Sequence, residues 1–348
     1  MDKDSNVNAR SGVYGSALQT ASSRGHKRVV KLLLDKGADA NTQSRLHGSA
    51  LYAASVRGHE QVVKLLLDKG TDINARGGEY GSALQAASVR GHEQVVKLLL
   101  DKGADVNAQG EECGNALYAA SEGGHDQVVK LLLDNGADVN AQVEEYGSAL
   151  YTASERGYKQ VVKLLLDKGA DVNARGGYYG TALYAASEGG HEQVVKLLLD
   201  KDSDVNAQGG VYSSALQTAS SRGHKRVVKL LLNKGADANT QSGLHGSALQ
   251  TASVRGHEQV VRLLLDKGAD INAWGGKYGS ALQAASVRGH EQVVKLLLNK
   301  GADVNAHGGK YGNALQAASV RGHEQVVKLL LDKGADVNAH NGRYGNAF

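Results

Sequence analysis

Residues 81–110 read GSALQAASVRGHEQVVKLLLDKGADVNAQG, and this stretch decides the fold because the chain consists almost wholly of copies of it. Close copies of its first four residues return every 33 positions, beginning at residues 15, 48, 81, 114, 147, 180, 213, 246, 279 and 312. No insertion interrupts this spacing. The 348 residues therefore contain ten full repeats, with a part-repeat at each end.

A longer duplication is superimposed on the 33-residue period. Residues 16–34 and 214–232 both read SALQTASSRGHKRVVKLLL, and the two stretches lie 198 residues apart. This separation equals six repeats, so we infer that six repeats were duplicated as one block.

Each repeat is predicted to form two helices and a turn. Ser16 and Gln19 form the S-x-x-Q pattern of a capping box, which opens a short first helix, and Gly25 is placed to end it. The apolar run VVKLLL at residues 62–67 predicts a second helix. Residues 72–78, DINARGG, predict an extended turn that leads into the next repeat.

One helix pair of this size cannot be stable alone. Ordering 33 residues costs about 1.5 kcal/mol per residue, or about 50 kcal/mol in all. A single pair leaves one apolar face in water, so the pairs must stack on one another. We therefore expect residues 1–348 to form one all-α solenoid with β-turn fingers, in which stacked helices lie about 8–10 Å apart.

The composition argues against several classes of function. The 40 basic and 36 acidic residues are nearly balanced, which disfavours charge-driven binding to nucleic acids or membranes. No apolar run approaches the roughly 20 residues of a membrane span, and the first ten residues lack the apolar segment of a signal peptide. We therefore expect a cytoplasmic protein. Cys113 is the only cysteine, which rules out a disulfide framework.

Histidine recurs at one position of nearly every repeat, and we interpret it as a packing residue at the start of the second helix. A metal site needs ligands within about 2 Å of one ion, whereas neighbouring copies should lie about 10 Å apart. Tyr158 fills this position in one repeat, which also favours packing. The histidines are His26, His59, His92, His125, His191, His224, His257, His290 and His323.

Enzyme activity is not expected. An active site is normally an asymmetric constellation of residues, whereas nearly every polar residue of this chain has counterparts in the other repeats. We therefore expect no catalytic residues, no cofactor and no bound metal.

The repeat resembles the ankyrin repeat. The 33-residue period, the GHxxVVxLLL helix and the GADVNA turn all match, and the resemblance covers essentially the whole chain. Where the family usually has Thr-Pro-Leu-His, this chain has Ser-Ala-Leu followed by Gln or Tyr, so we expect the capping box to replace the usual hydrogen bonds. Arrays of the GSALQAAS type are similar to those of fungal proteins, which are often attached to nucleotide-binding sensor domains.

The resemblance implies non-catalytic recognition of a protein or peptide in a concave groove, which the turn tips and first helices line in this family. The positions that vary between repeats fall on those same segments. The alternative is that exposed positions drift freely. Against it, the outer face of the second helix should also be exposed, yet it varies less.

Two sub-sites are expected on this surface. The central sub-site combines carboxylates with tyrosines, which suit a basic segment of the partner through charge-assisted hydrogen bonds and cation–π contacts. The alternative is that the tyrosine rings pack between repeats. The central sub-site consists of Glu112, Glu122, Glu145, Glu155, Glu188, Tyr118, Tyr151, Tyr178 and Tyr184. The C-terminal sub-site is basic and apolar and consists of Trp274, Lys277, Val287, Lys310 and Val320.

Two rival functions remain open at this point. The chain could be the ligand-sensing segment of a larger nucleotide-binding signalling protein, or a purely structural spacer. Sequence beyond both ends of the chain would distinguish them.

Two further expectations concern weak points of the array. Asp202 stands where other repeats have the glycine that ends the second helix, which predicts early local opening around residues 200–213. The chain begins within a turn and stops where another first helix should start. We therefore expect either end-to-end self-association or excision from a longer protein.

Overall fold

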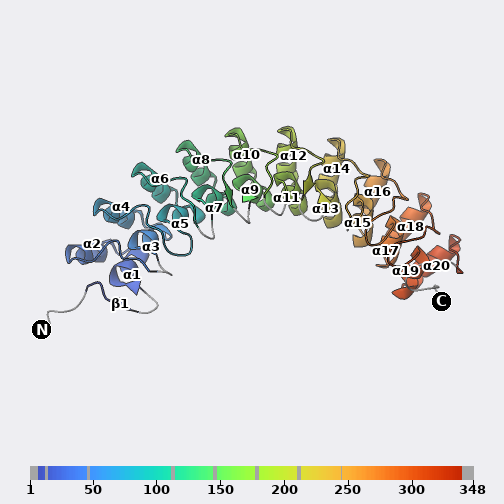
Figure 1. The fold of residues 1–348 in the computed structure, drawn as a ribbon, viewed down its shortest axis with the longest axis horizontal. Helices are drawn as coiled ribbons and strands as arrows, with labels where there is room; N and C mark the ends of the chain where they lie inside the picture. Colours follow the sequence, from blue (N-terminus) through green and yellow to red (C-terminus); the bar gives the residue numbers. More distant parts are fainter. Residues whose placement is uncertain are drawn as a thin grey trace. The chain divides into compact units, whose positions relative to one another are not determined.

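The computed structural model describes residues 7–11, 15–44, 48–110, 114–143, 147–176, 180–209, 213–243 and 245–338. It divides into two compact units, an N-terminal unit of Met1–Asp171 and a C-terminal unit of Val172–Phe348, which we describe separately. Both are built from helical hairpins (Figure 1), which confirms the predicted all-α repeat fold. A single array over residues 1–348 stays a prediction.

In the N-terminal unit each repeat contributes a short first helix and a nine-residue second helix. The first helices are α1 (Ala17–Ser23), α3 (Ala50–Ser55), α5 (Ala83–Val89), α7 (Ala116–Gly123) and α9 (Ala149–Arg156). The second helices are α2 (Lys27–Asp35), α4 (Glu60–Asp68), α6 (Glu93–Asp101), α8 (Asp126–Asp134) and α10 (Lys159–Asp167). Two fingers contain antiparallel two-residue strands, which are β1 (Arg10–Ser11) with β2 (Gly15–Ser16) and β3 (Gln142–Val143) with β4 (Gly147–Ser148).

The C-terminal unit repeats this arrangement. Its first helices are α11 (Ala182–Gly189), α13 (Ala215–Arg222), α15 (Ala248–Arg255), α17 (Ala281–Ser286) and α19 (Ala314–Val320). Its second helices are α12 (Glu192–Asp200), α14 (Lys225–Asn233), α16 (Glu258–Asp266), α18 (Glu291–Asn299) and α20 (Glu324–Asp332). One finger contains the antiparallel pair β5 (Gln208–Gly209) and β6 (Ser213–Ser214).

The capping box predicted for the first helix is present. Ser16 Oγ accepts a hydrogen bond from the backbone N–H of Gln19 at 3.2 Å, and Gln19 Oε1 accepts one from the backbone N–H of Ser16 at 2.8 Å. The same reciprocal pair opens α5, α13, α15, α17 and α19. Helices that carry Tyr in place of Gln keep only the first of the two bonds, because Tyr has no amide oxygen that could accept the second.

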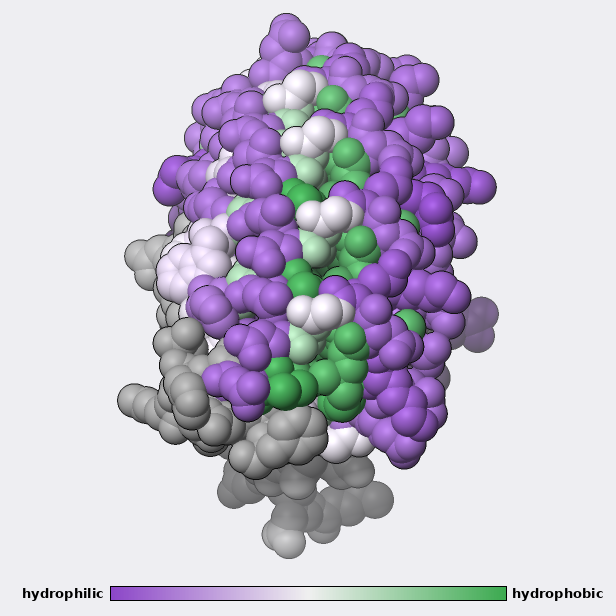
Figure 2. Space-filling view, turned by 90° about the vertical axis from the view of Figure 1, so that its right-hand side faces the viewer, coloured by the Kyte–Doolittle hydropathy of each residue, from purple (hydrophilic) through white to green (hydrophobic). Residues whose placement is uncertain are grey.

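The core of each unit lies between stacked repeats. First helices pack on the neighbouring first helices and second helices on the neighbouring second helices, so α3 contacts α1, α4 and α5. Leu84 of the first helix and Val96 and Leu99 of the second are at most 2% exposed. On the face that Figure 2 turns towards the reader, apolar and weakly polar side chains form a narrow strip between two hydrophilic bands.

The recurring histidines pack between repeats, as predicted. Nε2 of His59 lies 3.0 Å from the carbonyl oxygen of Ser23 in the preceding repeat, so this nitrogen donates the hydrogen bond. The ring also covers Gly25, where an added Cβ atom would lie 2.7 Å from Nδ1 of His59. Tyr158 takes the same place over Gly124. The glycine of the Gly-His pair is therefore required by the ring of the next repeat.

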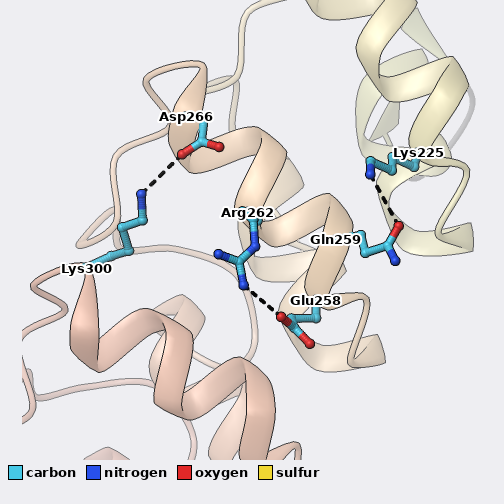
Figure 3. Close-up of polar contacts among 6 residues, drawn as sticks. All are labelled: Lys225, Glu258, Gln259, Arg262, Asp266 and Lys300. Atoms are coloured by element: carbon cyan, nitrogen blue, oxygen red, sulfur yellow. Dashed lines mark hydrogen bonds and ion pairs between the residues drawn. The ribbon is translucent and has the colours of Figure 1, made fainter.

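Two ladders of polar contacts join the turns after the second helices. Asn74 Oδ1 accepts a hydrogen bond from the backbone N–H of Asp105 at 2.9 Å, and the same bond recurs in both units. Lysine and aspartate form a parallel ladder of exposed ion pairs, one of which joins Lys300 to Asp266 at 3.1 Å (Figure 3). Figure 3 also shows Lys225 of α14 donating to Gln259 of α16.

Asp202 has the backbone conformation that the sequence predicted. Its φ angle is 60°, and it is the only residue other than glycine with a positive φ in the part of the chain that the structure describes. The equivalent glycines, such as Gly169 and Gly235, have φ angles of 88° and 90°. This turn therefore holds a side chain in the left-handed region, where glycine is favoured.

Candidate binding surface

An open groove of about 1220 Å³ lies along α1, α3 and α5 of the N-terminal unit. Its lining includes Thr20 of α1, Ala53 of α3, Val56 directly after α3, and Tyr80 of a finger. First helices and fingers therefore line a hollow surface within this unit, in agreement with the expectation from the sequence.

The tyrosines of the central sub-site are buried. Tyr118, Tyr151 and Tyr184 are 6%, 6% and 9% exposed, so they offer a partner almost no ring surface. The structure therefore favours the second of the two interpretations, in which these rings pack between repeats. Tyr118, Tyr151 and Tyr184 are therefore not contact residues for a partner.

Tyr52, which occupies the same helix position, shows what the buried ring does. Its hydroxyl accepts a hydrogen bond from the backbone N–H of Tyr80 in the next finger at 3.1 Å. The ring also fills the space beside Gly48 and Gly78, where added Cβ atoms would lie within 2.8 Å of it. Burial raises the pKa of the Tyr52 hydroxyl above its ordinary value. Tyr at this position thus connects one repeat to the finger of the next.

The carboxylates of the central sub-site lie at the ends of the first helices, where arginines partly compensate them. Arg156 pairs with Glu122 of the preceding repeat at 3.1 Å, and Arg222 pairs with Glu188 in the C-terminal unit. The side chain of Glu122 is still 40% exposed in its pair, and Glu155 is exposed. The surface is therefore less negative than the column of glutamates alone suggests. Glu112, Glu145 and Tyr178 lie outside the described residues.

The C-terminal sub-site is largely exposed. Trp274 is 58% exposed, and its ring lies against Gly308, where an added Cβ atom would be 2.5 Å from it. Lys277 and Lys310 extend from successive fingers, with their Nζ atoms 5.8 Å and 5.4 Å from the ring centroids of the tyrosines that follow them. A cation and an aromatic ring thus stand side by side on each of these two fingers.

Val287 is a correction to the predicted C-terminal sub-site. It is 3% exposed and packs with Tyr311 and Ala317 in a small apolar cluster, so it belongs to the core. Val320, one repeat later, is 49% exposed and remains a candidate. Burial acts to raise the pKa of Tyr311. The hydrogen bond from Arg321 and the nearby cations outweigh burial and hold this pKa below its ordinary value.

The described residues offer neither a metal site nor a membrane-spanning helix. Among the described residues, no three His, Cys, Asp or Glu side chains are grouped closely enough to hold a metal ion. Within the same ranges, none of the helices has the length and apolar character that crossing a membrane requires.

Comparison with known proteins agrees with the repeat architecture. The family model for ankyrin repeats, which comprises three copies, matches residues 2–77, 75–143, 117–209, 208–274 and 275–341. The crystal structure of the human ASB11 ankyrin repeat domain is similar to this chain with a TM-score of 0.57 and 28% sequence identity. The match covers 64% of this chain and 99% of that domain. No curated protein sequence matches the chain.

Ankyrin repeats generally mediate protein–protein interaction, and proteins built from them are typically non-enzymatic scaffolds. The matched segments extend from residue 2 to residue 341. The chain therefore belongs to the ankyrin-repeat family.

Proposed function

We propose that this chain recognises a partner protein or peptide through the face formed by its first helices and fingers, and catalyses no reaction. One observation carries the proposal. Residues that differ between repeats, such as Glu155, Trp274 and Lys310, are exposed on this face, whereas the differences at buried positions, such as that of Tyr118, leave the outer surface nearly unchanged. Differences among exposed residues of one face are expected of a surface that discriminates between partners.

The central sub-site is proposed to take a basic segment of the partner. Glu122 and Glu155 of the N-terminal unit support this proposal because each occupies the same exposed or half-exposed position at the end of a first helix, and Glu188 holds the equivalent position within the C-terminal unit. Arg156 already occupies part of Glu122, so a partner's lysine or arginine must share that carboxylate or displace Arg156. The C-terminal sub-site is proposed to comprise Trp274, Lys277, Lys310 and Val320.

Three finer expectations stay predictions. They are the cytoplasmic location, the end-to-end self-association and the fungal type of the array. The role of a sensing segment within a larger nucleotide-binding protein is a special case of the proposed recognition, since a sensor must also bind its ligand.

Site-specific photo-crosslinking tests the proposed function. A crosslinking amino acid is placed at Glu155 or Trp274 on the proposed face, and at Lys163 or Lys295 on the exposed side of a second helix as matched controls. We expect both face positions to crosslink the same protein in extracts of the source cells, and the controls to crosslink none. Equal crosslinking from the controls, or none from the face, would refute the proposal.

A further inference from the structure

Arginines line the groove of the N-terminal unit at regular intervals. Arg24, Arg57 and Arg90 stand 33 residues apart, at or just beyond the ends of α1, α3 and α5, and all three contribute to the groove wall. Their side chains are exposed. Glu79 is the only carboxylate among the described lining residues, so the groove has a net positive charge.

The same chain shows how this arginine is compensated elsewhere. Arg156 occupies the equivalent position and pairs with Glu122, which lies 34 residues earlier. The positions 34 residues before Arg57 and Arg90 hold Ser23 and Val56, which carry no charge. The ion pair that neutralises this column in the central repeats therefore cannot form in the groove.

The groove arginines consequently keep hydrogen-bond donors for a ligand. Within the described residues, neither Arg24 nor Arg57 has an ion pair or a side-chain hydrogen bond. Arg90 donates to the hydroxyl of Tyr80 at 3.0 Å, and its guanidinium lies 5.6 Å from the ring centroid, which holds it at the groove wall. A guanidinium has five N–H donors, so one bond to Tyr80 leaves several for a carboxylate.

We propose that this groove binds an extended acidic segment of a partner protein, with one carboxylate on each of Arg24, Arg57 and Arg90. Bidentate arginine–carboxylate pairs supply both attraction and geometry. The inference rests on the proposed function, because it assigns partner chemistry to one part of the same face. It concerns a separate site from the central glutamates, so the two sub-sites take segments of opposite charge.

The spacing of the arginines defines the motif. Stacked helices lie about 8–10 Å apart, so successive arginines should be about that far apart. A polyproline II segment turns once every three residues and rises about 3.1 Å per residue, so it places every third side chain on one side at about 9 Å intervals. The expected motif is therefore an acidic residue at every third position. Thr20 and Ala53, whose side chains are small, also line the groove.

Fluorescence anisotropy with labelled peptides and the full chain tests the motif. The probe is (Glu-Pro-Pro)₄, which prefers the polyproline II conformation. One control has the same composition with its four glutamates in a row, and a second is (Gln-Pro-Pro)₄. We expect the probe to bind at least about tenfold more tightly than either control, and added salt to weaken its binding because the contacts are exposed.

Variants of the chain test the site. Arg24→Ala and Arg57→Ala should each weaken probe binding by about threefold to tenfold, as expected for exposed bidentate pairs. Val56→Glu should weaken it comparably without removing an arginine, because it places a carboxylate before Arg90 as Glu122 stands before Arg156. Arg156→Ala is the matched control and should change binding by less than about twofold. Circular dichroism confirms that each variant is folded.

Several outcomes would overturn the inference. The first is that the Arg24→Ala, Arg57→Ala, Arg90→Ala triple variant binds the probe as tightly as the parent chain. The second is that Arg156→Ala weakens probe binding as much as Arg24→Ala or Arg57→Ala does. The third is that the parent binds the peptide with four glutamates in a row as tightly as the probe. Single-stranded DNA of equal charge binding as tightly as the probe would point to a nucleic-acid ligand instead. Crosslinking from Glu155 and Trp274 is measured in the same triple variant. If it persists while the peptide fails to bind, only this inference is lost and the proposed function stands.

Discussion

Replacing Asp202 by glycine should stabilise the C-terminal unit. At the nine equivalent turns the residue is glycine, with φ angles between 76° and 93°, and no atom lies within 4 Å of an added Cβ. The backbone N–H of this glycine donates a hydrogen bond to the carbonyl of a leucine three residues earlier, as Gly235 does to Leu232 at 3.2 Å. Within the described residues, the N–H of Asp202 makes no such bond. The aspartate therefore lacks a turn hydrogen bond as well as an easy backbone conformation.

The size of the effect follows from these two differences. Holding a residue with a side chain in the left-handed region costs about 1 kcal/mol, and aspartate lies at the low end because it tolerates this region. One recovered backbone hydrogen bond contributes about 0.5–1.5 kcal/mol. The greater flexibility of glycine in the unfolded chain offsets about 0.4–1 kcal/mol. We expect a net stabilisation of about 1 kcal/mol for Asp202→Gly.

Native-state hydrogen exchange measures this locally, which matters because repeat arrays often unfold in parts. Amides around residues 200–209 should exchange about fivefold more slowly in Asp202→Gly, since 1.4 kcal/mol corresponds to a factor of ten. The reciprocal change, Gly103→Asp in the N-terminal unit, should speed local exchange by a similar factor. If Asp202→Gly leaves exchange unchanged while Gly103→Asp accelerates it, the reasoning about Asp202 is wrong.

Three further predictions concern buried or half-buried polar side chains. Ser88 is fully buried and its hydroxyl has no hydrogen-bond partner among the described residues, so Ser88→Ala should raise the free energy of unfolding in urea by about 1 kcal/mol. Gln85 joins its own helix cap to the next finger, because its side chain accepts a hydrogen bond from Ser82 and donates one to Gly114. Gln85→Ala should therefore lower the free energy of unfolding by about 2 kcal/mol, and an unchanged value would exclude this role. Burial lowers the pKa of His290 below 6.5, so its stabilising effect is complete above pH 6.5 and is lost as the pH falls through the lower folded-state pKa. Thermal unfolding between pH 7.5 and 5 should therefore depend less on pH in His290→Asn than in the parent.

The fold could be predicted from the sequence because its signals are local. The capping box lies within four residues, from Ser16 to Gln19, and the apolar run of the second helix lies within one repeat. Left-handed turns follow from glycine, and even the exception at Asp202 was visible as a break in an otherwise regular column. Stacking follows from the exposed apolar face that one isolated helix pair would have.

The contacts between repeats were harder to predict, because their partners lie close to one period apart. Gln85 reaches Gly114 over 29 residues, and Asn74 reaches Asp105 over 31. Because the period is 33 residues, a residue faces a position of the next repeat that is a few residues away from its own equivalent. Complementary residues 29 or 31 positions apart, such as asparagine and a backbone turn, therefore indicate contacts between repeats that the sequence of one repeat does not show.

The tyrosines show why variation between repeats does not by itself identify a surface. Tyr52 and Gln85 occupy the same buried position of the first helix and reach the next finger in different ways. A change there alters how two repeats are joined and leaves the outer surface nearly unchanged. The valine column shows the converse, because Val287 is covered by Tyr311 whereas Val320 is exposed. Burial at a given position thus depends on the finger of the neighbouring repeat.

The charge of the proposed binding face follows from the same offset. Arg156 is compensated because the residue 34 positions earlier is Glu122, and Arg222 is compensated by Glu188 in the same way. Where that earlier residue is Ser23, the arginine one repeat later keeps its charge for a ligand. The totals of 40 basic and 36 acidic residues therefore do not predict the charge of this face. Ion pairs between neighbouring repeats neutralise the arginine in some repeats, and in others no glutamate stands where the pair would form. A change 34 residues before an arginine, such as Ser23→Glu before Arg57, should consequently alter partner choice. It alters no residue of the core.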